Sequence, residues 1–204
     1  MLEPGYDFEP EDGDLFFQDL VGSGASAIES VTPGFNRAEV SHMGMVVKIG
    51  QKKYIIEALP PEVRINPITV FLSRAKDYLM RPRVFVGRLK PAYRELIPAA
   101  KEKALKLRGL PYDRLYLTGE DAYYCSELIV DAFKYANNGI AFFPEHPMSF
   151  RDEETGEILD YWKRYYAYFG MDVPEGESGS NPGEISLSDK IEIIHRYGFL
   201  TNWY

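Results

Sequence analysis

The spacing of hydrophobic residues in the first half of the chain is typical of β-strands. Two apolar and β-branched runs, HMGMVVKI at 42–49 and KYIIEAL at 53–59, are separated by Gly50 and Gln51. Two such runs joined by a short turn predict a β-hairpin. Further short strands are predicted from GDLFFQ within 11–18, EVRINP at 62–67, PRVFVGRL at 82–89 and KIEIIHRYGF at 190–199.

In the second half the spacing becomes that of helices. Within 123–139 the apolar residues that share one helical face are Leu128, Ile129, Ala132, Phe133 and Ala136. Further helices are predicted at 23–30, 69–79, 95–109 and 157–170, and the Gly-, Ser- and Pro-rich stretch 175–186 predicts a loop. Early strands and late helices, with hairpin connections, favour an α+β fold around an antiparallel sheet.

Length and composition fit one globular domain. A domain has roughly 100–200 residues, and this chain has 204 residues, 45% of them hydrophobic. We expect a single domain over 1–204, with a core at about 12–150 and a C-terminal helix, loop and strand at 151–204. The composition excludes collagenous, disordered and disulfide-dense proteins.

The net charge of −8, from 23 Lys and Arg against 31 Asp and Glu, makes nucleic acid a poor partner. No apolar stretch reaches the length of about 18 residues that a transmembrane helix needs. The first residues, MLEPGYDFEPEDGD, lack the basic and apolar regions of a signal peptide. We therefore expect a cytoplasmic protein, or one of the periplasm or cell envelope if a leader peptide had been removed.

Cys125 is the only cysteine, so no internal disulfide can form. The three histidines, His42, His146 and His195, show no metal-binding spacing. We therefore expect neither a metal nor another cofactor. A single cysteine with a histidine elsewhere in the chain is either an inert buried thiol or a nucleophile.

Cys125 lies near the start of its predicted helix, with Glu120 or Asp121 as the expected N-cap. The spacing of Cys125, Ile129 and Phe133 puts the sulfur on the apolar face, which must pack on the sheet. A helix N-terminus stabilises an anion by at most about 2 kcal/mol, whereas ionising most of an ordinary thiol at neutral pH needs about 4 kcal/mol. A second positive group is therefore required, and an imidazolium is the usual one.

His42 opens the first hairpin strand, and Gly44 lies two residues later on the same face. The missing side chain of Gly44 leaves room for another backbone or a helix end. With a two-residue turn, position 44 opposes Glu57, whose carboxylate is then diagonal to His42 on that face. A carboxylate on the far ring nitrogen would fix the tautomer and favour the imidazolium.

Each of these residues also has a simpler interpretation. His42 could cap a strand end, Glu57 could face solvent on an edge strand, and Cys125 could pack in the core. His146 and His195 lack an acidic neighbour at strand spacing, and we assign them structural positions.

Several strings of the sequence resemble one family. They are GDLFFQDL (13–20), SHMGMVV (41–47), YIIEAL (54–59), LPYDRLY (110–116), YYCSELIVDAF (123–133) and NPGEISLS (181–188). They are similar to the NlpC superfamily of papain-like cysteine hydrolases, and more narrowly to its circularly permuted YiiX/YebB-like branch, which is related to the lecithin:retinol acyltransferases. The permuted branch places His before Cys, as this sequence does.

The resemblance implies a circularly permuted papain-like fold, in which an antiparallel sheet or partial barrel packs against helices that include the Cys-bearing one. It implies Cys125 as the nucleophile, His42 as the general base and Glu57 as the group that orients His42. The acyltransferase relatives carry a second His in place of the Glu, so Glu57 favours the bacterial hydrolase side.

The implied reaction is hydrolysis of an amide or peptide bond in a small peptide, a cell-wall fragment or an acyl-amine through a thioester. The oxyanion would be stabilised by the backbone N–H of Cys125 and a tyrosine hydroxyl. Tyr124 and Tyr112 are the candidates, and Tyr123 is a further aromatic residue for oxyanion or substrate binding. The alternatives are an acyltransferase or thioesterase that acts on lipid esters, and a catalytically idle ligand-binding module.

Overall fold

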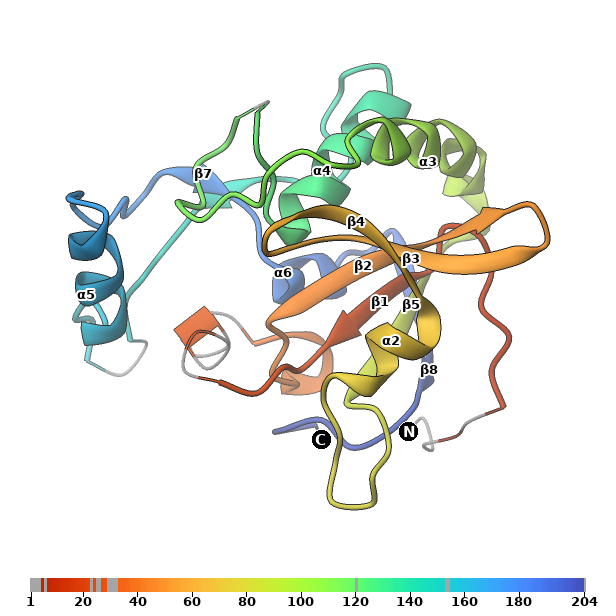
Figure 1. Ribbon diagram of the computed structural model, residues 1–204, viewed down its shortest axis with the longest axis horizontal. Helices are drawn as coiled ribbons and strands as arrows, with labels where there is room; N and C mark the ends of the chain where they lie inside the picture. The colour runs from red at the N-terminus through yellow and green to blue at the C-terminus, as the bar shows by residue number, and fades with distance from the viewer. Residues whose placement is uncertain are drawn as a thin grey trace.

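The centre of the molecule is a six-stranded antiparallel sheet (Figure 1). The computed structural model describes residues 5, 7–22, 24, 27–28, 33–119, 121–152 and 155–203, so the helix predicted at 23–30 lies largely outside the described residues. The strand order is β4-β3-β2-β1-β5-β8, and in the described part of the chain the sheet is open at both edges. The strands are β1 (Leu15–Gln18), β2 (His42–Ile49), β3 (Lys52–Leu59), β4 (Glu62–Pro67), β5 (Val84–Leu89) and β8 (Ile191–Arg196).

β2 and β3 form the predicted hairpin, and both lie inside the sheet with a neighbour on each side. Met45 pairs with Ile56, a register that continues to position 44 opposite Glu57, as the two-residue turn predicted. At the other side of β2, His42 lies opposite Gln18 of β1. Strand pairing therefore fixes the backbone of His42 against Gln18 of β1 and the backbone of Glu57 against Arg64 of β4.

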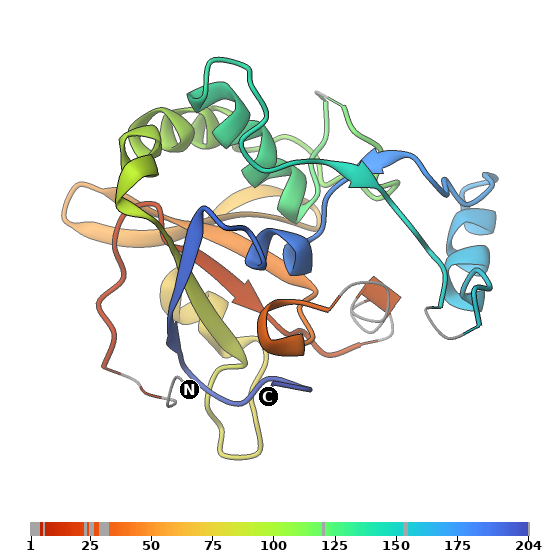
Figure 2. The same ribbon diagram turned by 180° about the vertical axis from the view of Figure 1, so that it is seen from behind.

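Helices cover both faces of the sheet, which confirms the predicted α+β fold. They are α2 (Ile68–Ser73), α3 (Ile97–Lys106), α4 (Cys125–Ala136) and the short 3-10 helices η1 (Phe35–Arg37) and η2 (Pro91–Leu96). α3 and α4 lie on one face and α2 on the other (Figures 1 and 2). Met43 and Met45 of β2 join the core beneath α4, whereas Val46 packs with Phe71 on the α2 side.

A second aromatic cluster lies beside the sheet, around α5 (Asp160–Tyr168) (Figure 1). Phe150 and Trp162 are buried there, apart from the main core. A two-stranded sheet of β6 (His146–Pro147) and β7 (Ser178–Gly179) lies between this cluster and the Cys-bearing helix. The cluster matters for function because it forms one wall of a pocket beside Cys125.

The helix predicted at 69–79 is wrong in its second half, since α2 ends well before residue 79. The Asp77 carboxylate accepts hydrogen bonds from the backbone N–H groups of Leu79 (2.8 Å) and Arg81 (2.9 Å). Met80 has a left-handed φ of 62°. An Asp that binds the N–H groups following it stabilises a turn instead of a helix.

The loop predicted at 175–186 is wrong in part, because it contains β7 and the one-turn helix α6 (Pro182–Ser186). The side chain of Asn181 accepts a hydrogen bond from the N–H of Glu184 (2.9 Å), and Pro182 occupies the start of the helix. An N-cap Asn followed by Pro is a helix-start signal. The sequence carried this signal inside a stretch whose composition is that of a loop.

Candidate active site

Cys125 is the first residue of α4, and it is buried. The N-cap is Tyr124 instead of the acidic residue expected at 120 or 121. The Glu127 carboxyl oxygens accept hydrogen bonds from the backbone N–H groups of Tyr124 (3.3 Å) and Gly119 (3.0 Å), which satisfies donors at this end of the helix. The predicted apolar face is present, since Ile129 and Cys125 belong to the same buried core cluster.

His42 interacts with both of the other predicted site residues. Its Nε2 lies 2.6 Å from Oε2 of Glu57, and both side chains are buried. The Cys125 thiol acts on the same imidazole, through hydrogen bonding and charge that both raise the pKa of His42. Burial lowers the pKa of His42, but the hydrogen bonds and charges of Cys125 and Glu57 outweigh it and raise this pKa from 6.5 to about 9. The site therefore favours the imidazolium at neutral pH.

The space beside Gly44 was expected to admit either another backbone or a helix end. A Cβ at Gly44 would collide with Cγ2 of Ile55 and would lie 3.0 Å from the carbonyl oxygen of Ile56 and 3.2 Å from Cβ of Glu57. The neighbouring strand β3 therefore fills this space. The first of the two expected neighbours, another backbone, is present, and a helix end is not. This close approach brings Glu57 near His42.

Glu57 has two further partners that the sequence did not reveal. Arg74, which follows α2, donates from Nη1 to Oε2 at 2.6 Å and from Nη2 to Oε1. Asn66 of β4 donates from Nδ2 to Oε1 at 2.7 Å. Burial raises the pKa of Glu57, but His42 and Arg74 together lower it from 4.5 to about 2. The carboxylate is therefore ionised throughout the physiological range.

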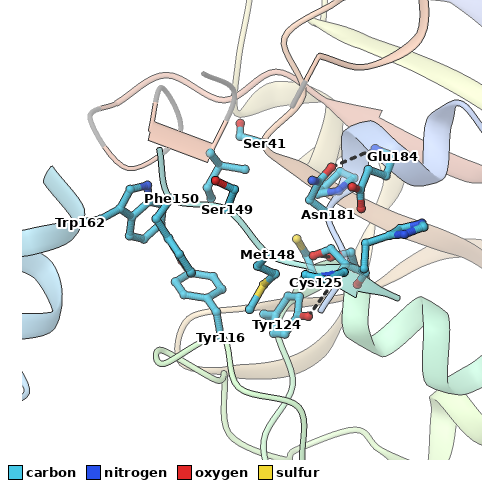
Figure 3. A pocket seen from close by; sticks show the side chains of 16 residues that line it. Ser41, Tyr116, Tyr124, Cys125, Met148, Ser149, Phe150, Trp162, Asn181 and Glu184 are labelled. Carbon is cyan, nitrogen blue, oxygen red and sulfur yellow. Dashed lines mark hydrogen bonds between the residues drawn. The ribbon is translucent and has the colours of Figure 1, made fainter. Parts of the chain in front are cut away.

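A pocket of about 180 Å³ opens beside Cys125. Its apolar lining consists of Ile28, Tyr116, Pro147, Met148, Phe150 and Trp162, and its polar lining includes Ser41, Ser126, His146, Ser149, Ser180, Asn181 and Glu184. Figure 3 shows the thiol on the same side as Asn181 and Glu184, with Phe150 and Trp162 at the far end. The pocket thus joins a polar, sulfur-bearing side to an apolar, aromatic end.

Among the tyrosines selected from the sequence, Tyr124 lines this pocket. Its phenolic oxygen accepts a hydrogen bond from the backbone N–H of Ser180 at 3.0 Å. Burial raises the pKa of Tyr124, so its hydroxyl keeps its proton at neutral pH.

Tyr123 and Tyr112 do not belong to the pocket lining. The Tyr123 hydroxyl donates to Oδ2 of Asp131 at 3.0 Å, on a later turn of α4. The Tyr112 hydroxyl lies 3.5 Å from that of Tyr116, and burial raises the pKa of Tyr112. The charge of Cys125 also raises the pKa of Tyr112, so Tyr112 lies near the thiol although it does not line the pocket, whereas Tyr116 does.

The two remaining histidines differ in position. His195 bonds through Nε2 to the carbonyl oxygen of Gly5 (3.0 Å) and stacks on Phe8, which is the structural position expected for it. His146 lines the pocket, although the sequence suggested a structural position. Burial raises the pKa of the nearby Glu184, and the charge of His146 acts in the opposite direction. His146 and Glu184 are neighbours because β6 carries the first and α6 the second, and strand spacing in the sequence could not predict this.

Comparison with known proteins places this chain in a family. The model of a family described as "Permuted papain-like amidase enzyme, YaeF/YiiX, C92 family" matches residues 9–194. The chain belongs to this permuted papain-like amidase family. The resemblance noted in the sequence is therefore confirmed, and the chain carries the fold of a cysteine hydrolase family.

Two relatives of this amidase family member can be compared over most of their length. The protein YiiX of Escherichia coli (strain K12) is 25% identical over 202 residues, which cover 98% of this chain and 93% of YiiX. The crystal structure of a protein called metalloprotein yiiX, from Escherichia coli O157:H7, matches with a TM-score of 0.76 at 22% identity, over 94% of this chain and 99% of that one. The second similarity concerns the fold alone.

Within the described ranges, no group of three or more His, Cys, Asp or Glu side chains could hold a metal ion. The helices within the same ranges include none that is long and apolar enough to cross a bilayer.

Proposed function

We propose that this chain is a cysteine amidase that cleaves an amide bond in a small peptide, a cell-wall fragment or an acyl-amine. The observation that carries the proposal is the position of the His42 imidazole. Its Nε2 bonds the buried Glu57 carboxylate at 2.6 Å, and its pKa is raised by both Glu57 and the thiol of Cys125, which lines a pocket. Such an arrangement activates a cysteine as a nucleophile.

In the proposed reaction the Cys125 thiolate attacks the substrate carbonyl, and a C–S bond forms. The His42 imidazolium then donates its proton to the leaving amine as the C–N bond breaks, which leaves a thioester. Water attacks the thioester, His42 accepts its proton, and the carboxylic acid and the thiolate are released. Glu57 holds the imidazole in place and stabilises its charged form.

We further propose that the oxyanion binds to the backbone N–H of Cys125 and the hydroxyl of Tyr124. The first N–H groups of a helix have no partner within the helix, and they point toward the site. The oxygen of Tyr124 already accepts a hydrogen bond from Ser180, so the hydroxyl proton is available to a second acceptor. Tyr123 is less suited because its proton goes to Asp131.

The test is hydrolysis of N-acyl p-nitroanilides and dipeptide amides by the wild-type chain and Cys125→Ala. The variant is expected to lose turnover, with a melting temperature nearly unchanged, since the substitution removes one buried sulfur. Intact-mass measurement on a quenched wild-type reaction should find an acyl group on Cys125. Equal turnover by the variant would contradict the proposal.

One observation favours a second function, an acyltransferase or thioesterase acting on lipid esters. The far end of the pocket is apolar, with Met148, Phe150 and Trp162 in its lining, and an acyl chain would suit such a surface. An acyl adduct on Cys125 after incubation with phospholipid, and none with the amides, would assign the chain to this second class. A catalytically idle module would instead show a thiol that iodoacetamide alkylates no faster than free cysteine at about pH 6.

A further inference from the structure

Arg74 forms the most extensive contact with the Glu57 carboxylate. Both terminal guanidinium nitrogens donate to it, one to each oxygen, in the bidentate geometry that fixes the plane of a carboxylate. Asn66 adds a third donor on Oε1. The carboxylate therefore cannot rotate, and Oε2 remains directed at His42.

The element that carries Arg74 also contacts the imidazole directly. Phe71, three residues earlier, stacks on the His42 ring with 5.6 Å between centroids and 28° between planes. The Arg74 guanidinium lies over the same Phe71 ring, 5.2 Å from its centroid. Gln18 donates from Nε2 to the Phe71 carbonyl oxygen at 2.8 Å, which ties this end of α2 to β1. Arg74 therefore belongs to a fixed assembly around the imidazole.

The charges of the assembly balance only when Arg74 is included. In the nucleophilic state Cys125 and Glu57 are negative and His42 is positive, so these three buried groups carry a net charge of −1. Arg74 brings the sum to zero. Uncompensated charge is costly in a buried site. Removing the guanidinium therefore disfavours the loss of a proton from Cys125, Glu57 or His42.

Other charged and titratable groups around the site have different partners. Arg64 lies opposite Glu57 in the strand pairing, but its guanidinium donates to the carbonyl oxygens of Leu59 and Pro60. On the α4 side, Cys125 faces tyrosines whose pKa values are raised by burial, so they are neutral. Arg74 is thus the cation that the described residues supply to Glu57, besides His42 itself.

We propose that Arg74 is a positioning residue of the reaction: it fixes Glu57 against His42, and its charge sets the pH range in which the thiolate–imidazolium pair forms. This inference rests on the Cys–His–Glu site of the proposed function. It does not depend on which bond the protein cleaves, and the test is chosen accordingly.

The test measures the rate constant of iodoacetamide alkylation against pH. Because the chain has one cysteine, the reagent reports on Cys125 alone. The variants are Arg74→Met, which removes the charge, Arg74→Lys, which keeps it, and Arg81→Met as a matched control. The Arg81–Asp77 pair resembles the Arg74–Glu57 pair in burial, with side chains 17% and 3% exposed against 18% and 0%, but it does not contact the site.

For Arg74→Met we expect the pH profile of alkylation to move to higher pH by about half a unit or more, because a nearby positive charge is lost. Arg74→Lys should keep the wild-type midpoint of the alkylation profile but lower the rate about threefold to tenfold, because a lysine cannot form the bidentate contact with both Glu57 oxygens. Arg81→Met should keep the wild-type profile even if its melting temperature falls.

A wild-type profile for Arg74→Met would overturn the inference, and so would an equal displacement in Arg81→Met. If Arg74→Met does not fold, Arg74→Lys decides alone, and a wild-type rate or a displaced midpoint in that variant counts against the inference. Failure of the proposed amidase function would appear separately, as an absence of amide hydrolysis with the alkylation profiles intact.

Discussion

Replacing Glu57 with Gln tests how strongly the buried carboxylate supports both the fold and the imidazolium. The substitution keeps the size of the side chain and removes its charge. Four donors, one from His42, two from Arg74 and one from Asn66, converge on the two oxygens. In Gln one oxygen becomes an NH₂ group, which must face one of these donors, so at least one buried hydrogen bond is lost.

The magnitude follows from the ionisation of the pair. The pKa of Glu57 falls from 4.5 to about 2, which corresponds to about 3 kcal/mol in favour of the carboxylate. The pKa of His42 rises from 6.5 to about 9, an effect of about the same size. Both values contain the same His42–Glu57 interaction, so they are not added. Breaking a buried ion pair costs about 3–5 kcal/mol, and we expect about 3 kcal/mol because Arg74 keeps some contact with water.

The assay is urea unfolding followed by circular dichroism between about pH 3 and pH 9. The Glu57 pKa is lowered, so its stabilising contribution is complete above pH 4.5 and is lost as the pH falls toward 2. The His42 pKa is raised, so its contribution is complete below pH 6.5 and is lost as the pH rises through about 9. The difference in unfolding free energy between wild type and Glu57→Gln should therefore be largest between pH 4.5 and 6.5.

A matched control is Glu102→Gln, which removes a carboxylate that is 61% exposed and paired with Lys106 on the surface of α3. Its effect should stay within about 0.5 kcal/mol at every pH. At neutral pH the Glu57→Gln variant should melt roughly 6–12 °C below wild type. A Glu57→Gln variant as stable as the control, or a difference from wild type that does not vary with pH, would refute the reasoning.

Two further predictions concern residues beside the site. Gly44→Ala should lower the unfolding free energy by about 1–3 kcal/mol, because the new Cβ collides with Ile55 of β3. The control Gly119→Ala, whose Cβ would meet only one atom at 4.0 Å, should cost less than about 1 kcal/mol. Equal losses of unfolding free energy in the two variants, measured by chemical denaturation, would contradict this account. Burial raises the pKa of Glu127 from 4.5 to about 8, so its contribution to stability is complete below pH 4.5 and is lost as the pH rises through 8. Glu127→Gln should therefore reduce the fall in melting temperature between pH 5 and 8. If the melting temperature of the variant falls with pH as steeply as that of wild type, ionisation of Glu127 is not the cause of the fall.

The central part of the fold could be predicted because its signals are local. A two-residue turn between two apolar runs determined the register that sets Glu57 diagonal to His42. An acidic residue inside an apolar run required a partner, and Glu57 has that partner in His42. The helical spacing after Cys125 placed the thiol at a helix start.

The remaining features depend on contacts between distant segments. Arg74 reaches Glu57 because α2 ends early at a turn organised by Asp77, and the helical pattern of 69–79 gave no sign of that end. His146 and Trp162 line the pocket through β6 and α5, whose positions no local spacing specifies. The buried carboxylate indicated that further donors exist, but it could not say which residues supply them.

The measurement that tests the central claim most directly is the rate of iodoacetamide alkylation of Cys125 at about pH 6, where free cysteine is almost entirely protonated. A thiol activated by His42 should react at least about tenfold faster than free cysteine, and His42→Gln should abolish the difference. A wild-type rate no higher than that of free cysteine, or an equally fast His42→Gln variant, would contradict the account of Cys125 as a nucleophile activated by His42.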